Sequence, residues 1–195
     1  MFEFVKKYKD CGLALPERKT SDSAGYDLAA AKDIIIPSLW EMYKQLNNAY
    51  LDEDNISTFT LSLEDMAHLT KKYNLKPTLV STGLKCKLPE GTYLELSVRS
   101  STPLKYWLIL ANGVGVIDRD YYNNESNEGE IFLQLINLSP FPIKIQKGDL
   151  IGQAIVKPYL TLEGDCASGV RTGGFGSTST QSESSAEDTL RRMIT

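Results

Sequence analysis

Short runs in which apolar and polar residues alternate make up much of this 195-residue chain. Such alternation is typical of half-buried β-strands, because successive side chains of a strand point to opposite faces. It is clearest in TYLELSV at 92–98 and IFLQLIN at 131–137. The pattern predicts strands over Phe2–Lys6, Ile34–Ile36, Leu79–Leu84, Tyr93–Val98, Ile131–Asn137, Ile143–Ile145 and Leu150–Lys157. Turn-type breaks separate these runs, which favours an all-β sandwich or barrel.

One stretch, from Pro37 to about Asn74, has helical spacing instead. Ser38 followed by Glu41 forms a capping box, the signature of a helix start. A second such pair stands at Ser62 and Asp65, and apolar residues follow both pairs at helical spacing. We therefore expect a helical hairpin inserted at about 37–74, outside the barrel. Core packing explains its apolar stripe, and the chain's one histidine, His68, is expected on a helix surface.

Length and composition suit one domain with one insertion, with enough apolar residues (42%) to bury a core. We expect a single domain over 1–178 and a flexible Ser/Thr-rich extension over 179–195. The net charge is -4 and there is no cluster of basic residues. This argues against a nucleic-acid polymer as partner, since a phosphate backbone demands dense Lys and Arg. A single nucleotide needs only a few cations and stays possible.

The cysteines and the absence of long apolar runs bear on the compartment. Cys11, Cys86 and Cys166 are widely spaced and odd in number, which speaks against a disulfide framework or a zinc site. No stretch resembles a signal peptide or reaches the roughly 20 apolar residues of a membrane span. We expect a soluble protein of the cytoplasm or another reducing intracellular compartment, with no membrane partner.

The segment ANGVGVIDRDY at 111–121 has the strongest chemical signal. Its glycines allow a backbone to approach a ligand closely, because no Cβ stands in the way. Asp118 follows an apolar run and precedes Tyr121, an arrangement suited to a base that activates water beside a flat ligand. The structural alternative is a β-hairpin with a polar corner, since Asn-Gly between apolar residues is a strong hairpin signal.

Four further segments have both a structural and a chemical interpretation. In SAGYDL, Asp27 either begins a strand after a turn or orders the waters of a Mg²⁺ ion. Arg99-Ser100-Ser101 ends a strand with three donors suited to phosphate oxygens. In GDLIGQ, Gln153 is a polar residue in an apolar run, able to face solvent or a phosphate. RTGGFGST at 171–178 is either a flexible linker or an anion-binding backbone with one ring, Phe175, for a flat base.

Taken together and in this order, SAGYDL, RSS, NGVGVIDRDY, GDLIGQ and RTGGFGST resemble the five motifs of the trimeric dUTPase family. The resemblance covers Ser21 to Thr178, apart from the helical stretch. It implies a jelly-roll type β-barrel, and a homotrimer in which each site draws motifs from all three chains. It also implies hydrolysis of dUTP to dUMP and pyrophosphate with Mg²⁺, which keeps uracil out of DNA and supplies dUMP for dTMP synthesis.

The resemblance also implies a role for each motif residue. Asp118 would activate water against the α-phosphate, and Tyr121 would stack under the deoxyribose and exclude a 2′-hydroxyl. Asp27 would order the water shell of the metal. The uracil edge would be read by Asn112 and the backbone of Gly115, Val116 and Ile117. Phosphates would be held by Arg99, Ser100, Ser101, Gln153, Arg171, Ser177 and Thr178, while Phe175 and Gly176 of the tail would cover the uracil.

Three features depart from the family pattern. The tail arginine usually stands three residues before the first glycine of GGFG, where this chain has Val170, so Arg171 is shifted by one residue. Residues 122–128 intervene between the motif tyrosine and Gly129-Glu130-Ile131, which makes this hairpin longer. The helical stretch at about 37–74 is an insertion.

Two other functions are compatible with parts of this pattern. A dCTP deaminase shares the fold and an RSS-like motif, but its catalytic glutamate is replaced here by Gln134, which cannot shuttle protons. The second is a regulatory protein that binds dUTP and contacts partners through the insertion and the tail. A turnover assay separates these functions from dUTP hydrolysis.

Overall fold

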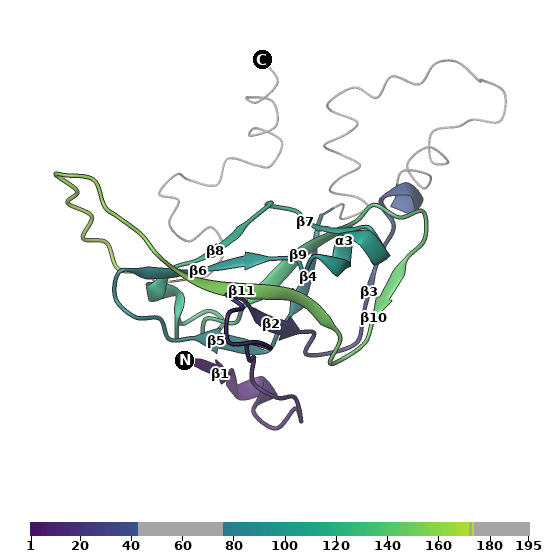
Figure 1. Ribbon diagram of the computed structural model, residues 1–195, viewed down its shortest axis with the longest axis horizontal. Helices are drawn as coiled ribbons and strands as arrows, with labels where there is room; N and C mark the ends of the chain where they lie inside the picture. The colour runs from purple at the N-terminus through teal and green to yellow at the C-terminus, as the bar shows by residue number, and fades with distance from the viewer. Residues whose placement is uncertain (43–75, 172, 174–195) are drawn as a thin grey trace, which may run out of the picture.

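The computed structural model describes residues 1–42, 76–171 and 173 of the chain. These residues form a mostly β structure (Figure 1). The elements in chain order are β1 (Phe2–Phe4), η1 (Lys6–Tyr8), β2 (Tyr26–Ala29), β3 (Ile34–Ile36), β4 (Thr78–Ser81), β5 (Leu84–Cys86), β6 (Thr92–Ser97), α3 (Ser101–Tyr106), β7 (Leu108–Leu110), β8 (Gly115–Ile117), η2 (Arg119–Tyr121), β9 (Phe132–Asn137), β10 (Ile143–Ile145) and β11 (Leu150–Pro158).

Two sheets form the body of the fold. One has the strand order β2-β11-β6-β8 and the other β4-β9-β7, while β10-β3 and β1-β5 form two-stranded sheets. Every named strand pair is antiparallel. Neighbours in each sheet come from distant parts of the sequence, as expected for the jelly-roll type of barrel.

The core lies between the two sheets and follows from the alternation in the sequence. Leu94 and Leu96 of β6 and Leu133 and Leu135 of β9 are all at most 2% exposed. They belong to one apolar cluster that also includes residues of β2, β4, β7 and β11. The residues between them, such as Gln134, are only half-buried because they point to the opposite face of their strand.

The predicted strands are found, with differences at their ends. β3 and β10 have the predicted bounds, whereas the predicted run Leu79–Leu84 is divided into β4 and β5. The break falls at Thr82, whose hydroxyl donates to the carbonyl of Ile131 at 2.7 Å and so leaves the strand pattern. The short helix α3 was not predicted, because six residues are too few to show helical periodicity.

The turn at Asn112-Gly113 differs from the β-hairpin interpretation. β7 pairs with β9, and β8 pairs with β6, so the two strands on either side of the turn belong to different sheets. Gly113 has φ of +67°, a conformation that glycine adopts without steric cost. The turn therefore carries the chain from one sheet to the other, and the hairpin interpretation is wrong.

Ser38 stands at the N-terminus of a helical turn at 39–42, where its capping box predicts a helix start. Its hydroxyl oxygen accepts hydrogen bonds from the amides of Trp40 (3.1 Å) and Glu41 (3.4 Å), which is the N-cap arrangement. The same hydroxyl donates to the carbonyl of Ser139 at 2.6 Å, and Ser38 is fully buried. The rest of the predicted helical pair, with His68, lies outside the described residues, as does the extension at 179–195.

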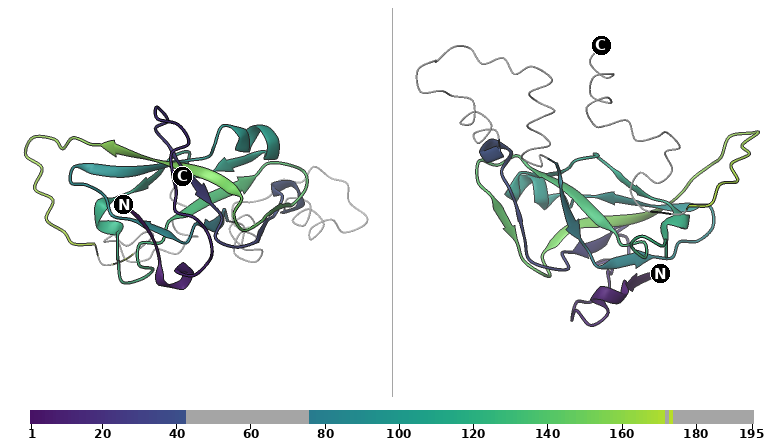
Figure 2. Two further views of the ribbon diagram at one scale, coloured as in Figure 1. Left: turned by 60° about the horizontal axis from the view of Figure 1, so that its bottom comes forward. Right: turned by 180° about the vertical axis from the view of Figure 1, so that it is seen from behind.

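Residues 159–170 form an arm that extends away from the body after β11 (Figures 1 and 2). Leu160, Leu162 and Val170 on this arm are each at least 87% exposed. The chain then returns, so that Arg171 contacts residues of η2. An arm with large exposed apolar side chains is typical of a segment that packs against another chain.

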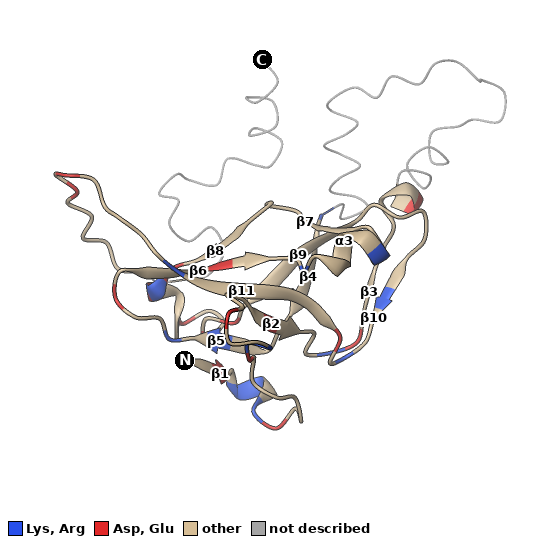
Figure 3. Ribbon diagram, in the orientation of Figure 1, with Lys and Arg blue, Asp and Glu red and all other residues tan. Residues whose placement is uncertain are grey.

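Within the described residues, positive and negative charges are mixed. Lys and Arg are scattered among Asp and Glu rather than gathered on one face of the ribbon (Figure 3). No helix in this part of the chain is long and apolar enough to cross a membrane. Cys11, Cys86 and Cys166 are all free.

Candidate active site

Asp27, Arg99 and Gln153 come from three separate motifs and lie together at one end of the four-stranded sheet. Gln153 of β11 stands opposite Asp27 of β2 on one side and opposite Ser97 of β6 on the other. The Nε of Arg99 lies 3.0 Å from Oδ1 of Asp27. We call Asp27, Arg99, Ser100, Ser101 and Gln153 the phosphate cluster, after the role predicted for it.

The two serines of the phosphate cluster follow Arg99 directly. The amide of Thr102 donates to the carbonyl of Arg99 at 2.9 Å, so the chain turns into α3 at this point. Ser100 is exposed and Ser101 is half-buried. The turn therefore presents two hydroxyls next to a guanidinium, a donor set that suits phosphate oxygens.

A cavity of about 190 Å³ lies next to the Asn112-Gly113 turn, where residues of β6, β7, β8 and β9 meet. It is lined by Leu96, Leu110, Asn112, Gly115, Val116, Ile117, Phe132 and Gln134. The four residues predicted to read uracil are thus brought together. The volume is below the roughly 300 Å³ of a drug-sized pocket and suits one small ring.

Gln134 also lines this cavity, a position that was not predicted from the sequence. It occupies an outward position of β9. Its side-chain amide has one acceptor and two donors that can face the cavity, which we call the base cavity after the uracil-reading role predicted for its residues. A polar residue in the alternating run IFLQLIN is the only sequence signal for it. That signal does not distinguish a cavity from solvent, because both lie on the outward face of the strand.

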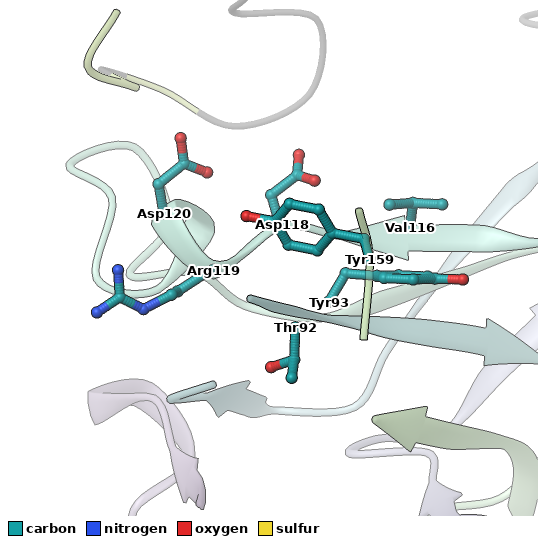
Figure 4. Close-up of a pocket in the computed structure, with 7 residues that line it drawn as sticks. All are labelled: Thr92, Tyr93, Val116, Asp118, Arg119, Asp120 and Tyr159. Carbon is teal, nitrogen blue, oxygen red and sulfur yellow. The ribbon is translucent and has the colours of Figure 1, made fainter. Parts of the chain in front are cut away.

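Asp118 directly follows β8 and stands at the N-terminus of η2. Its side chain is 52% exposed and faces a hollow of about 580 Å³. Figure 4 shows the carboxylates of Asp118 and Asp120 turned to the same side of the ribbon, with Tyr93, Tyr159 and Val116 beside them. The two tyrosines were not predicted to be near the site, since they come from the start of β6 and the residue after β11.

Arg171 forms ion pairs with Asp120 of η2 and with Asp118, which directly precedes η2. Its Nη2 is 2.5 Å from Asp118 and its Nε is 2.9 Å from Asp120. Its guanidinium carbon lies 5.8 Å from the centroid of the Tyr121 ring. The structure thus places Arg171 beside the predicted base of its own chain, and away from the phosphate cluster.

Tyr121 is buried and hydrogen-bonded, with 5% of its surface exposed. Its hydroxyl donates to the carbonyl of Glu130 at 2.9 Å and accepts from Nδ2 of Asn127 at 2.8 Å. Burial is the main cause that raises the pKa of this phenol. The hydroxyl is therefore a neutral donor, fixed at both its hydrogen and its oxygen.

Within a single chain, the phosphate cluster and the predicted base Asp118 lie far apart. Asp118 follows Ile117, which pairs with Leu94, whereas Gln153 pairs with Ser97 at the far end of β6. The separation along β6 is about 13 Å at ~3.3 Å per residue. In addition, β8 and β11 flank β6 on opposite sides. A single α-phosphate cannot touch both groups of the same chain.

The phosphate cluster has one carboxylate, and within the described residues no three His, Cys, Asp or Glu side chains come together as a metal cage. Asp27 is already paired with Arg99. Mg²⁺ usually keeps several waters and binds through one or two carboxylates and substrate phosphates. One carboxylate beside phosphate donors fits such a metal. The tail residues Phe175, Gly176, Ser177 and Thr178 lie outside the described residues.

Comparison with known proteins identifies the family. The dUTPase family model matches residues 59–179. Deoxyuridine 5'-triphosphate nucleotidohydrolase of Lactococcus lactis is 36% identical over 179 residues, which cover 91% of this chain and 95% of that protein. The corresponding protein of Hydrogenobaculum sp. is 31% identical over 179 residues, which cover 89% of this chain and 95% of that protein.

Solved structures agree with this result. The dUTPase of Streptococcus mutans has a TM-score of 0.62 at 33% identity, covering 84% of this chain and 98% of that one. The dUTPase of phage phi11 of S. aureus has a TM-score of 0.54 at 15% identity, which shows a shared fold. The motif order, the two-sheet barrel and these relatives lead to one conclusion: this chain is a member of the dUTPase family.

Proposed function

We propose that the chain is a dUTP diphosphatase that hydrolyses dUTP to dUMP and pyrophosphate. The main structural support is the way three distant motif residues come together. Asp27, Arg99 and Gln153 are separated by more than fifty residues from one another in the sequence, yet the register of three strands brings them into one cluster. Family membership over most of the chain supports the same reaction.

Asp118 is the residue proposed to act as general base. It accepts a proton from a water molecule while the water oxygen attacks the α-phosphorus. The bond between that phosphorus and the bridging oxygen breaks, and pyrophosphate leaves with the electron pair. The half-exposed carboxylate beside an open hollow supports this role, because water can reach it. General-base catalysis typically contributes ~10²–10⁴-fold.

The phosphate cluster is proposed to bind and orient the triphosphate. Arg99 donates through its guanidinium, Ser100 and Ser101 through their hydroxyls, and Gln153 through its amide. Asp27 would order the water shell of a bound Mg²⁺, whose charge would offset that of the triphosphate. Fixing the phosphates in line with the attacking water lowers the barrier by removing motional freedom beforehand.

The base cavity and Tyr121 are proposed to select the nucleoside. Asn112 and the backbone of Gly115–Ile117 read the uracil edge, while the Tyr121 ring lies under the deoxyribose and leaves no room for a 2′-hydroxyl. The small cavity beside β8 supports this arrangement. From the tail, Phe175 and Gly176 close over the uracil, and Ser177 and Thr178 add donors for the phosphates.

We also propose that the active protein is a homotrimer. The separation of Asp118 from the phosphate cluster supports it, because a complete site then needs groups from two copies. The extended arm with its exposed leucines provides apolar surface for contact with a neighbouring copy. Arg171 must also leave Asp118 before that carboxylate can accept a proton from water, and the triphosphate is an anion that can attract the guanidinium.

The experiment is a pyrophosphate-release assay with Mg²⁺ and dUTP, with dCTP, dTTP and UTP measured in parallel. We expect rapid release from dUTP and release from the others lower by at least ~10²-fold, a ratio that hydrogen-bond selection can supply. Ammonia formation from dCTP would instead show a deaminase. Binding of dUTP without turnover would show a nucleotide-dependent regulator.

A further inference from the structure

The loop at 122–128, by which this chain is longer than the family pattern, folds back on Tyr121. Asn127 donates from its Nδ2 to the Tyr121 hydroxyl at 2.8 Å. The same hydroxyl donates to the carbonyl of Glu130 at 2.9 Å, just beyond the loop. The hydroxyl end of the phenol is therefore held from two directions, by the Asn127 side chain of the loop and by the backbone of Glu130.

Asn124 holds Asn127 in place. Its Nδ2 donates to Oδ1 of Asn127 at 2.7 Å and to the carbonyl of Tyr121 at 2.9 Å. Its Oδ1 accepts from the amides of Ser126 (3.0 Å) and Asn127 (3.2 Å). Asn124 is buried, with 7% of its surface exposed. The amide of Asn127 is thus oriented by a second buried amide, which leaves its NH₂ group directed at the phenol.

The loop is also tied to the body of the fold. Ser81 of β4 donates its hydroxyl to the buried carboxylate of Glu130. Lys85 of β5 donates to Oδ1 of Asn123 at 2.6 Å, and the hydroxyl of Tyr122 donates to the carboxylate of Glu3 at 2.9 Å. The frame around Tyr121 is therefore fixed to two sheets and is part of the barrel.

These contacts matter because the Tyr121 ring can exclude a 2′-hydroxyl only if the ring is held in a fixed position. Excluding one hydroxyl requires that the ring cannot retreat by about the size of an oxygen atom, and misplacements near 1 Å are known to change rates strongly. A phenol with a free hydroxyl end can tilt about its side-chain torsions. Hydrogen bonds at the oxygen and at the hydrogen remove that freedom, because a tilt breaks both.

We propose that Asn127, oriented by Asn124, is a positioning residue that fixes the Tyr121 ring and so sets the discrimination between dUTP and UTP. This inference rests on the proposed function and adds a residue from the extended loop to it. Asn127 acts through Tyr121 and has no direct role in the chemistry.

The test compares kcat/KM for dUTP and UTP in three variants. Asn127→Ala should lower the dUTP-to-UTP ratio about five-fold or more, the effect expected from losing a hydrogen bond of ~1 kcal/mol. Tyr121→Phe removes the same hydrogen bond from the other side, together with the one to the Glu130 carbonyl, and should lower the ratio too. In the double variant the loss of the dUTP-to-UTP ratio should be smaller than the product of the two single losses, because both substitutions remove the hydrogen bond between Asn127 and Tyr121.

Glu125→Ala is the matched control, since it changes an exposed residue of the same loop that is not part of the network around Asn124 and Asn127. It should leave the ratio unchanged. If turnover of UTP is too slow to measure, the dissociation constants of α,β-imido analogues of dUTP and UTP give the same ratio. If Asn127→Ala does not fold, Asn127→Asp replaces it, because it keeps the size and loses the donor.

An unchanged ratio in a folded Asn127 variant would overturn the inference, as would equal losses for both nucleotides, which would mean that Asn127 is only structural. These results leave the proposed function intact. A wild-type protein that fails to hydrolyse dUTP would instead refute the proposed function.

Discussion

Arg171 is the residue whose position has the most direct consequence for catalysis. It binds Asp118 and Asp120 together, and only the first is a proposed catalytic group. While Arg171 stays there, it competes with water for Asp118. The second ion pair, to Asp120, contributes to that competition without touching the reacting atoms.

Replacing Asp120 by Asn should therefore make Arg171 easier to displace. Asp120 is 56% exposed, and exposed ion pairs typically contribute ~0.2–1 kcal/mol, so we expect KM for dUTP to fall by at most about five-fold with kcat little changed. The control is Glu125→Gln, which removes one exposed negative charge from the neighbouring loop. Equal KM changes in both variants would mean that overall charge, and not the contact with Arg171, is responsible.

At this scale the sequence predicts residue types better than partners. Asp118, Arg99 and Gln153 are found in the motif order alone, because that order is specific. The contacts of Arg171, Asn127 and Gln134 are not predicted, because each contact joins segments whose proximity depends on the fold. The shift of the tail arginine by one residue was visible, but its position on Asp118 was not.

At the scale of elements, β11 is the strand that assembles the phosphate cluster. It lies between β2 and β6, and Gly152 precedes the functional Gln153. A Cβ built on Gly152 would lie 2.5 Å from Cδ1 of Leu133 and 2.9 Å from the carbonyl oxygen of Ser97. The second neighbour is backbone, so the strands would have to shift.

Gly152→Ala should accordingly destabilise the fold by ~1–3 kcal/mol, the usual cost of overpacking. It should also reduce kcat/KM, because a shift between β11 and β6 moves Gln153 relative to Arg99. Urea unfolding measures the first effect. Gly169→Ala is the matched control, because among the described residues no atom outside its two chain neighbours lies within 4 Å of a Cβ at this position. A Gly152 variant as stable as the control would show that the strands are not closely packed there.

Alternation predicts most strands because one face of each is buried in the common core. It fails at the Asn112-Gly113 turn for a reason of topology. A tight Asn-Gly turn has the same local sequence whether its strands pair with each other or with strands of two sheets. Pairing of β7 with β9 and of β8 with β6 is decided by residues far away in the chain.

At the scale of the whole molecule, the distance between Asp118 and the phosphate cluster predicts that active sites form between copies of the chain. If sites form between copies, a chain lacking Asp118 and a chain lacking Arg99 can complement each other. Refolding an equal mixture of Asp118→Asn and Arg99→Ala chains should restore about a quarter of wild-type activity, since one ordered pair in four has both groups in a closed ring.

Each variant refolded alone is the control and should remain inactive. Analytical ultracentrifugation of the mixture establishes that trimers have formed. A trimeric mixture no more active than its two components would contradict sites shared between copies.

The central claim is that Asp118 is the base in hydrolysis of dUTP, and Asp118→Asn tests it most directly. The measurement is the single-turnover rate of pyrophosphate release at saturating enzyme, with dUTP binding measured by calorimetry on the same preparation. The account predicts at least ~10²-fold slower release with nucleotide binding retained, because the amide keeps the size and loses the proton acceptor. Release at a near-normal rate from a folded variant that binds dUTP would contradict it.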